Sequence, residues 1–215
     1  MFIASPLSDL SAILKARAIS SVKVSVLPNL YEVMVSSSVF YVSADARYLF
    51  HGELIDTERK INLAEEARAF SRKSFFMSVD GSDLIEFLPE DGEVVETLYV
   101  YTDIDCSYCR KFHRDIDKLN DAGIAVQYLA FPRSGPDSES FQKAVNVWCS
   151  PDKQKALTSA KKGKRVASQV CTNPVTKHRE FGVEMGITGT PAVYTSQGRA
   201  LGGYVPADEL IRLLR

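Results

Sequence analysis

Two cysteines three positions apart, Cys106 and Cys109, are the residues of this sequence whose type and spacing best suit chemistry. On a helix, positions i and i+3 share a face, so the two thiols can close a small disulfide ring. A run rich in β-branched and aromatic residues, 94–101, precedes them and a helical pattern follows, so Cys106 stands where a strand becomes a helix. Unpaired N–H groups and the helix dipole stabilise a thiolate there. The spacing therefore predicts thiol–disulfide exchange, with Cys106 attacking and Cys109 resolving the mixed disulfide.

Two other interpretations fit a close cysteine pair: half of a zinc site, or two thiols buried in a core. A zinc site would need a second close pair, and the other cysteines, Cys149 and Cys171, stand too far apart to supply one. The position between a predicted strand and a predicted helix favours redox chemistry. We expect neither a metal nor a cofactor.

Charged residues near the pair act in opposite directions. Asp103 and Asp105 come just before Cys106, and nearby negative charge raises the pKa of a thiol. Their side chains can also point away or cap the helix, so the sequence leaves the net shift open. Three basic residues that follow on the helix can offset the two acids: Arg110, Lys111 and His113.

A strand–helix–strand unit positions the cysteine pair. The helix after the first strand places Cys109, Phe112, Ile116 and Leu119 on one face, and residues 124–131 form the second strand. This order predicts a βαβ unit with two parallel strands. Further helices are predicted at 138–149, 152–162, 174–185 and 206–214, with a hairpin of residues 191–195 and 199–201.

The first part of the chain has a different pattern. Residues 6–18 have helical spacing, and the short runs after them predict a small antiparallel sheet. Residues 63–76 then predict a charged helix that serves either as a connector between domains or as an ordinary surface helix. The predicted strands are 22–27, 30–35, 39–42 and 48–50, and the apolar stripe of the charged helix is Leu63, Ala67, Phe70 and Ser74.

Composition excludes several classes of function. The 215 residues include 26 basic and 27 acidic ones, and a net charge of −1 argues against nucleic acid as a partner and against a polybasic membrane role. No run of eighteen apolar residues occurs that could span a membrane. Residues 1–6 lack the pattern of a signal peptide, so we expect either an intracellular protein or one whose signal has been removed.

Four segments of the chain resemble bacterial periplasmic disulfide isomerases of the DsbC/DsbG type. The segment around the cysteines is YTDIDCSYCRKFH, residues 101–113, and YLAFPR at 128–133 fits the strand that follows it in that family. Residues 147–149 (VWC) and 188–193 (TGTPAV) fit two further segments. The order and spacing match over about residues 6–214.

The resemblance implies an α+β and α/β fold with three parts. Residues 1–60 would be an N-terminal dimerisation domain with a small antiparallel, cystatin-like sheet, residues 61–80 a linker helix, and residues 81–215 a thioredoxin-like catalytic domain. It also implies a V-shaped homodimer in the periplasm that is reduced by a membrane electron donor of the DsbD type. Its substrates would be misfolded proteins that contain disulfides.

Four further residues take roles from the resemblance. Cys149 and Cys171 would form a structural disulfide, and two buried free thiols are the alternative. Thr190 and Pro191 would be joined by a cis peptide bond that faces the cysteine pair, whereas a proline that opens a strand can also be a simple edge residue. The cis form would leave the backbone N–H and C=O of Thr190 free to pair with an extended substrate.

Two positions differ from related patterns. The dipeptide between the cysteines, Ser107-Tyr108, also occurs in glutaredoxins, so the balance between isomerase, reductase and oxidase is open. Thioredoxins carry a buried acid six residues before the first cysteine, and Val100 stands there in this chain, as expected of the isomerase branch. The alternatives to a disulfide isomerase or reductase are a disulfide oxidase, a glutaredoxin-like reductase, and a periplasmic chaperone-like binding protein.

The small N-terminal sheet itself suggests a dimer, because it buries little surface and has unpaired strand edges. Tyr31–Val35 and Val39–Val42 are the candidate interface strands, with Gly52 at a close approach. A monomer whose small domain folds against its own catalytic domain is the alternative. A basic stretch that includes Lys161 is interpreted as a solvated helix and loop, in preference to a docking patch. His113 and His178 are expected to be surface or half-buried residues, because neither has a ligand partner at metal spacing.

Overall fold

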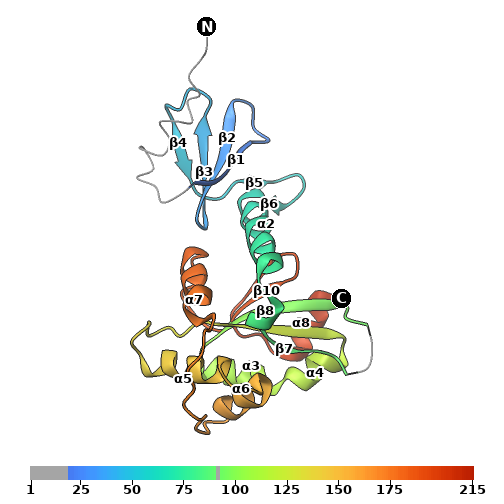
Figure 1. Cartoon of the computed structure of the whole chain (residues 1–215). Helices are drawn as coiled ribbons and strands as arrows, with labels where there is room; N and C mark the ends of the chain where they lie inside the picture. Colours follow the sequence, from blue (N-terminus) through green and yellow to red (C-terminus); the bar gives the residue numbers. More distant parts are fainter. Residues whose placement is uncertain (1–18, 91–92) are drawn as a thin grey trace. The chain divides into compact units, whose positions relative to one another are not determined.

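A computed structural model describes residues 19–90 and 93–215 (Figure 1). Two compact units divide between Ser71 and Arg72. The helix predicted over residues 6–18 lies outside the described residues. Within the described ranges, none of the helices is long and apolar enough to cross a membrane.

A four-stranded antiparallel sheet forms the first unit, as predicted. Its strands follow chain order, and a two-residue turn joins the two middle strands because Val35 pairs with Ser38. Ser36 has a φ of 53° in this turn. A short hairpin that the sequence did not reveal comes next. The strands of the sheet are β1 (Ile19–Val24), β2 (Leu30–Val35), β3 (Ser38–Ser43) and β4 (Leu49–His51), and the hairpin consists of β5 (Ile55–Asp56) and β6 (Ile61–Asn62).

Successive residues of β2 point to opposite faces of this sheet, so two small cores form. Val33 and Val42 are buried on one face. Met34 and its neighbours on the other face contact the first turns of α2 (Leu63–Ser78) through Ala64 and Ala67. The predicted stripe of this helix is partly wrong, because the small alanines allow close contact with the sheet while Phe70 is 61% exposed.

The second unit is built on a five-stranded sheet with the order β11-β10-β8-β9-β7. β8 and β9 run parallel, with Leu98 opposite Val126, which confirms the predicted βαβ unit. The other pairs are antiparallel, and β7 was not predicted. The strands are β7 (Ile85–Phe87), β8 (Glu96–Thr102), β9 (Ile124–Ala130), β10 (Ala192–Thr195) and β11 (Ala200–Gly202), and a 3-10 helix, η2 (Gly81–Asp83), precedes them.

Helices cover both faces of this sheet, and their ends lie close to the predicted ones. One difference concerns the helix after the cysteines, which the sequence predicts as continuous. It breaks at Asp115, whose φ of −96° and ψ of 9° are not helical, yet all four residues of the predicted face are buried. The helices are α3 (Ser107–Arg114), α4 (Ile116–Asp121), α5 (Glu139–Trp148), α6 (Lys153–Lys161), α7 (Val175–Glu184) and α8 (Ala207–Leu214).

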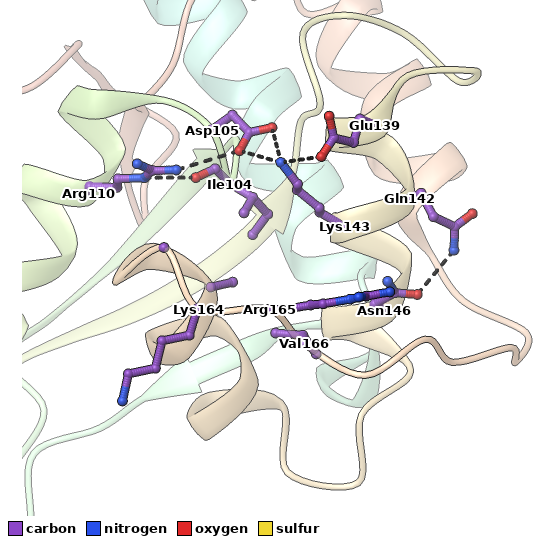
Figure 2. A pocket seen from close by; sticks show the side chains of 12 residues that line it. Ile104, Asp105, Arg110, Glu139, Gln142, Lys143, Asn146, Lys164, Arg165 and Val166 are labelled. Atoms are coloured by element: carbon purple, nitrogen blue, oxygen red, sulfur yellow. Dashed lines mark hydrogen bonds and ion pairs between the residues drawn. The ribbon is translucent and has the colours of Figure 1, made fainter.

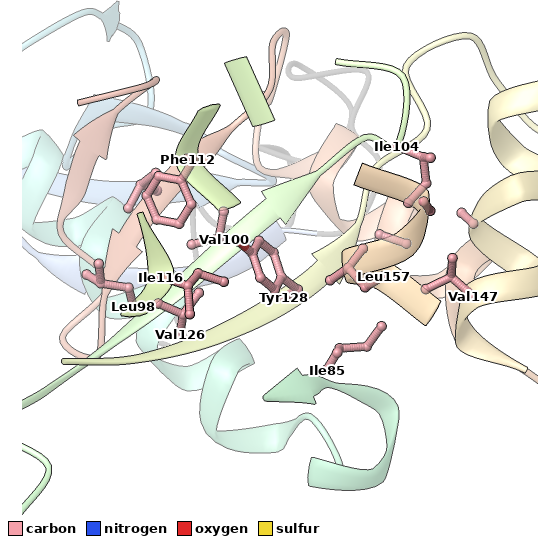
Figure 3. Close-up of a cluster of buried hydrophobic side chains, with 14 of the residues drawn as sticks. Ile85, Leu98, Val100, Ile104, Phe112, Ile116, Val126, Tyr128, Val147 and Leu157 are labelled. Carbon is pink, nitrogen blue, oxygen red and sulfur yellow. The ribbon is translucent and has the colours of Figure 1, made fainter. Parts of the chain in front are cut away.

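The alternation of β8 divides the core of the second unit in two. Leu98 and Val100 point to the face that α3, α5 and α6 cover, where Phe112, Tyr128 and Leu157 also lie (Figure 3). Tyr101 points to the opposite face and contacts a cluster that includes Phe76 from the end of α2 and Ile187. The end of β8 is thereby fixed from both sides, and the chain that leaves it leads to Cys106.

Candidate active site

Cys106 occupies the N-cap of α3. Its φ of −76° and ψ of 122° are extended, and its sulfur accepts a hydrogen bond from the Cys109 backbone N–H at 3.3 Å. A sulfur in this position takes the role that an oxygen of Ser or Asp commonly has at a helix start, and it meets the positive end of the helix dipole. Cys106 therefore lies between a strand and a helix, as the sequence predicted.

The two thiols differ in acidity more than in exposure. Cys106 is 3% exposed and Cys109 is 1% exposed. A hydrogen bond from the Cys109 side chain, aided by the positive charge of Arg133, lowers the pKa of Cys106 to about 5, although burial opposes the shift. Burial raises the pKa of Cys109 well above its ordinary value. At neutral pH the negative charge therefore resides on Cys106.

The Thr190–Pro191 peptide bond is cis and lies beside this sulfur. The protonated Cys106 thiol donates a hydrogen bond to the Thr190 carbonyl oxygen at 3.1 Å. The sequence analysis expected the Thr190 carbonyl to be free for a substrate. While Cys106 is protonated, this carbonyl instead accepts the Cys106 S–H. A groove of about 610 Å³ runs along the same segment, and its lining includes residues 186–192, Tyr108 and Tyr204. The rings of the two tyrosines lie 5.8 Å apart.

Asp103 does not present an unpaired charge to Cys106. Its carboxylate is almost fully buried, and one oxygen accepts hydrogen bonds at 3.0 Å from both the backbone N–H and the guanidinium of Arg133. The other oxygen accepts the backbone N–H of Asp105 at 2.9 Å. Asp103 therefore shapes the loop before Cys106, and Arg133 balances its charge.

Asp105 is balanced by two cations that line a pocket of about 420 Å³ (Figure 2). Its carboxylate contacts Lys143 at 3.1 Å and Arg110 at 3.5 Å. Arg110 thus has the offsetting role that the sequence suggested, but the other two candidates do not. Lys111 lies over the Tyr108 ring, and burial lowers the pKa of His113 to about 3, so that its imidazole is neutral.

Comparisons with known proteins agree with this arrangement. Residues 83–215 match a family described as a thioredoxin-like domain, and residues 4–65 match the disulfide bond isomerase protein N-terminal domain. The thiol:disulfide interchange protein DsbC of Escherichia coli (strain K12) is 32% identical over 182 residues, which cover 85% of this chain and 75% of that protein. The DsbC of Haemophilus influenzae is 31% identical over 204 residues, covering 94% of this chain and 82% of that protein.

This chain belongs to the DsbC family. A solved structure of a disulfide interchange protein from Neisseria gonorrhoeae also superimposes with a TM-score of 0.55 and 28% identity, covering 63% of this chain and 97% of that one. Membership of the DsbC family makes the protein a thiol–disulfide oxidoreductase with a thioredoxin-like domain. The resemblance found in the sequence and the predicted fold class are both confirmed.

The other two cysteines of this DsbC-family chain lie apart from the reactive pair. Cys149 ends α5, and the structure joins it to Cys171 through a disulfide with an S–S distance of 2.04 Å. The linked residues are separated by 22 positions in the sequence. Among residues 19–90 and 93–215, no group of three His, Cys, Asp or Glu side chains could hold a metal ion.

Three buried polar residues of the second unit were not recognised from the sequence. Lys161 was expected in a solvated stretch but is 5% exposed, because it continues the buried face of Leu157 and Ala160 at helical spacing. His113 and His178 are buried as well, and not surface or half-buried as expected. That helical spacing is a signal that could have identified Lys161, whereas the contacts of the histidines depend on the tertiary fold.

Proposed function

We propose that Cys106 and Cys109 form the redox centre with which this DsbC-family protein rearranges incorrect disulfides in exported proteins. The observation that carries the proposal is the Cys106 sulfur at the N-cap of α3, beside the cis Pro191 segment and with a pKa lowered to about 5. A thiolate is the attacking species, and a thiol of low pKa is also a good leaving group. Both properties suit repeated exchange with a substrate.

Thr190 and Pro191 are the proposed substrate-binding residues. The Thr190 carbonyl accepts the Cys106 S–H in the protonated state, and a thiolate cannot donate this bond. Ionisation of Cys106 therefore frees the carbonyl for a backbone N–H of an extended substrate, as in strand addition. The groove beside the segment, with Tyr108 and Tyr204 in its lining, offers apolar surface to residues next to the substrate cysteine.

We further propose that residues 1–60 dimerise the protein, that residues 61–80 link the parts, and that residues 81–215 catalyse. The match of residues 4–65 to the N-terminal domain of disulfide isomerases supports a homodimer. A periplasmic location and reduction by a membrane donor of the DsbD type agree with the family. The Cys149–Cys171 disulfide supports an oxidising compartment, because such bonds are rare in the cytosol.

Refolding of scrambled ribonuclease tests the proposal. The wild-type protein should restore ribonuclease activity, and the Cys106→Ala variant should not. A chaperone-like binding protein would instead suppress aggregation equally well with or without Cys106, and would restore no ribonuclease activity. Equal restoration of ribonuclease activity by wild type and Cys106→Ala would show that Cys106 is not the redox centre.

The reduction potential against glutathione separates an isomerase or reductase from an oxidase. The lowered pKa of Cys106 stabilises the reduced form, which makes the pair more oxidising than one with an ordinary thiol. We expect the potential to lie between that of a reductant such as thioredoxin and that of a strong oxidant.

A further inference from the structure

Lys161 is a buried cation beneath the active-site loop. It ends α6 and is 5% exposed, whereas Lys162, next in the chain, is exposed. Lysine is seldom buried to this degree without a charged partner, because removing an ammonium group from water is costly. The position therefore requires a compensating interaction.

The ammonium group of Lys161 contacts two neutral oxygens. Its Nζ donates hydrogen bonds at 2.7 Å to the Thr102 hydroxyl and at 2.7 Å to the Asp103 backbone carbonyl. An ammonium group has three N–H donors, so one position on Nζ is left. Within residues 19–90 and 93–215, none of the carboxylates forms an ion pair with it.

The groups whose negative charge would act on Lys161 are Asp103 and the two thiols of the redox pair. Negative charge on Cys109, Asp103 or Cys106 raises the pKa of Lys161, and Arg110 on α3 lowers it. The Asp103 carbonyl that accepts a hydrogen bond from Lys161 also accepts the Cys106 backbone N–H at 3.2 Å, so Lys161 lies against the loop that leads into the redox pair. Other ionisable groups in this environment are His113, next to Lys161, and Tyr128 and Arg133, which face Cys109.

We propose that Lys161 is a positioning residue for the resolving step, in which its positive charge stabilises the negative charge on the Cys109 sulfur. The inference rests on the roles proposed above for Cys106 and Cys109. Such a charge is needed because burial disfavours a thiolate at Cys109.

In the resolving step, Cys109 loses its proton to solvent, and its sulfur attacks the Cys106 sulfur in the mixed disulfide with the substrate. The Cys106–Cys109 bond forms while the bond from Cys106 to the substrate sulfur breaks. The substrate sulfur leaves with the electron pair and takes up a proton through solvent, so the enzyme dithiol is oxidised and the substrate cysteine is reduced.

Alkylation of Cys109 in a Cys106→Ser background tests the effect on this sulfur without any substrate. Lys161→Gln keeps N–H donors for Thr102 and Asp103 but removes the charge, and Lys162→Gln is the matched control on the same helix end. We expect Lys161→Gln to slow alkylation about tenfold, which corresponds to one unit of pKa. Lys162→Gln should leave the rate unchanged.

A second measurement follows the release of a fluorescent peptide from its mixed disulfide with Cys106. Lys161→Gln should form the mixed disulfide normally and resolve it about tenfold more slowly, again the equivalent of one pKa unit. A wild-type protein that forms no mixed disulfide at Cys106 would refute the proposed function. Normal formation with unchanged alkylation and resolution in Lys161→Gln would refute only the role of Lys161, as would equal slowing of reactions at Cys106 and Cys109.

If Lys161→Gln does not fold, Lys161→Met provides an unbranched neutral side chain of similar length. A third measurement needs no Lys161 variant at all. Burial lowers the pKa of Lys161 to about 8, so its charge disappears above that pH. The Cys109 alkylation rate in the Cys106→Ser protein should rise in proportion to hydroxide below about pH 8 and fall about tenfold behind that proportion above it. A rate that stays proportional to hydroxide throughout would overturn the proposal.

Discussion

At the scale of single residues, the site depends on the different acidities that their surroundings give to Cys106 and Cys109. Both thiols are almost fully buried, so access to solvent does not distinguish them. The N-cap position and the Cys109 hydrogen bond favour charge on Cys106, while the surroundings of Cys109 disfavour it. Acidity is therefore the property that assigns their roles.

We predict that Cys106 is alkylated first in the reduced protein. A brief pulse of iodoacetamide near neutral pH should label Cys106, because its lowered pKa of about 5 keeps it ionised, and Cys109 should react slowly. Peptide mass spectrometry measures the two labels. Labelling found mainly on Cys109 would contradict the assignment, and unfolding in denaturant before the pulse should equalise the two rates.

The sequence predicted the reactive pair because a motif and its strand–helix setting are local properties. It did not predict how Asp103 is neutralised, since Arg133 comes from the turn that follows β9, 30 residues away. The burial of Lys161 depends in the same way on where α6 meets α3. Contacts of this kind follow from the tertiary fold, and spacing along the chain says little about them.

At the scale of elements, most helices and strands follow from hydrophobic periodicity. The failures are short or irregular elements, such as β5, β6 and β7, and the break at Asp115. Strands of two or three residues carry little alternation, and of those in the described chain only β4 and β11 were recognised. The break is invisible to periodicity, because Phe112, Ile116 and Leu119 are buried whether or not the helix is continuous.

His113 connects three elements through hydrogen bonds, and its burial predicts how the stability of the fold changes in acid. It lies on α3, and its ring nitrogens hydrogen-bond the Tyr128 hydroxyl of β9 at 3.1 Å and the Thr158 hydroxyl of α6 at 3.0 Å. Burial lowers its pKa from 6.5 to about 3 in the folded protein. The unfolded chain therefore binds more protons between these values, and the folded state loses stability as the pH falls through that range.

Each such histidine should lower the free energy of unfolding by up to about 1.4 kcal/mol per pH unit in that window. His178, whose pKa is also lowered to about 3 by burial, should contribute in the same direction. Urea unfolding at neutral and mildly acidic pH measures the effect. We expect His113→Gln to reduce the loss of stability on acidification and His51→Gln, at an exposed position, to leave it unchanged; equal pH dependence in both variants would contradict the explanation.

The Cys149–Cys171 disulfide joins the end of α5 to the segment before α7. Closing a loop of 22 positions restricts the unfolded chain, so the paired substitution of both cysteines by Ser should lower the free energy of unfolding by about 3 kcal/mol. Thiol counting provides the direct check. The native protein without reductant should yield no further alkylated cysteine once Cys106 and Cys109 are blocked, and two additional labels would show that the disulfide is absent.

At the scale of the whole molecule, the proposed dimer needs a revised contact. Tyr31–Val35 and Val39–Val42 were the candidate interface strands, but β2 and β3 are the inner strands of the sheet and already pair on both sides. Among the described residues, the outer strands of this sheet are β1 and β4. All three residues of β4 are exposed, and a Cβ added to Gly52 just beyond would meet nothing within 4 Å in the described chain.

We therefore predict that β4 contributes to the dimer contact and that isomerase activity depends on it. Phe50→Asp places a charge on an exposed ring position of this edge, and should convert the dimer to a monomer because a desolvated carboxylate is costly. Val183→Asp, at an exposed apolar position of α7, is the control. Sedimentation equilibrium measures the mass, with isomerase and insulin-reduction assays in parallel.

The monomeric Phe50→Asp variant should lose isomerase activity while it still reduces insulin. Isomerisation requires the enzyme to stay with one substrate through several exchanges, whereas reduction requires a single one. A wild-type protein that is monomeric at micromolar concentration, or a monomeric variant with full isomerase activity, would contradict the prediction.

The N-cap sulfur has a consequence for folding thermodynamics. Charged Cys106 stabilises the start of α3 through the Cys109 N–H and the helix dipole, and oxidation of Cys106 removes that charge. Because a thermodynamic cycle must close, whatever free energy the thiolate adds to the folded state also appears in the equilibrium constant for reducing the pair. The first turn of α3 thus connects redox chemistry to heat resistance: the reduced protein should melt at a higher temperature than the oxidised one, and the gap should narrow in acid as Cys106 is protonated.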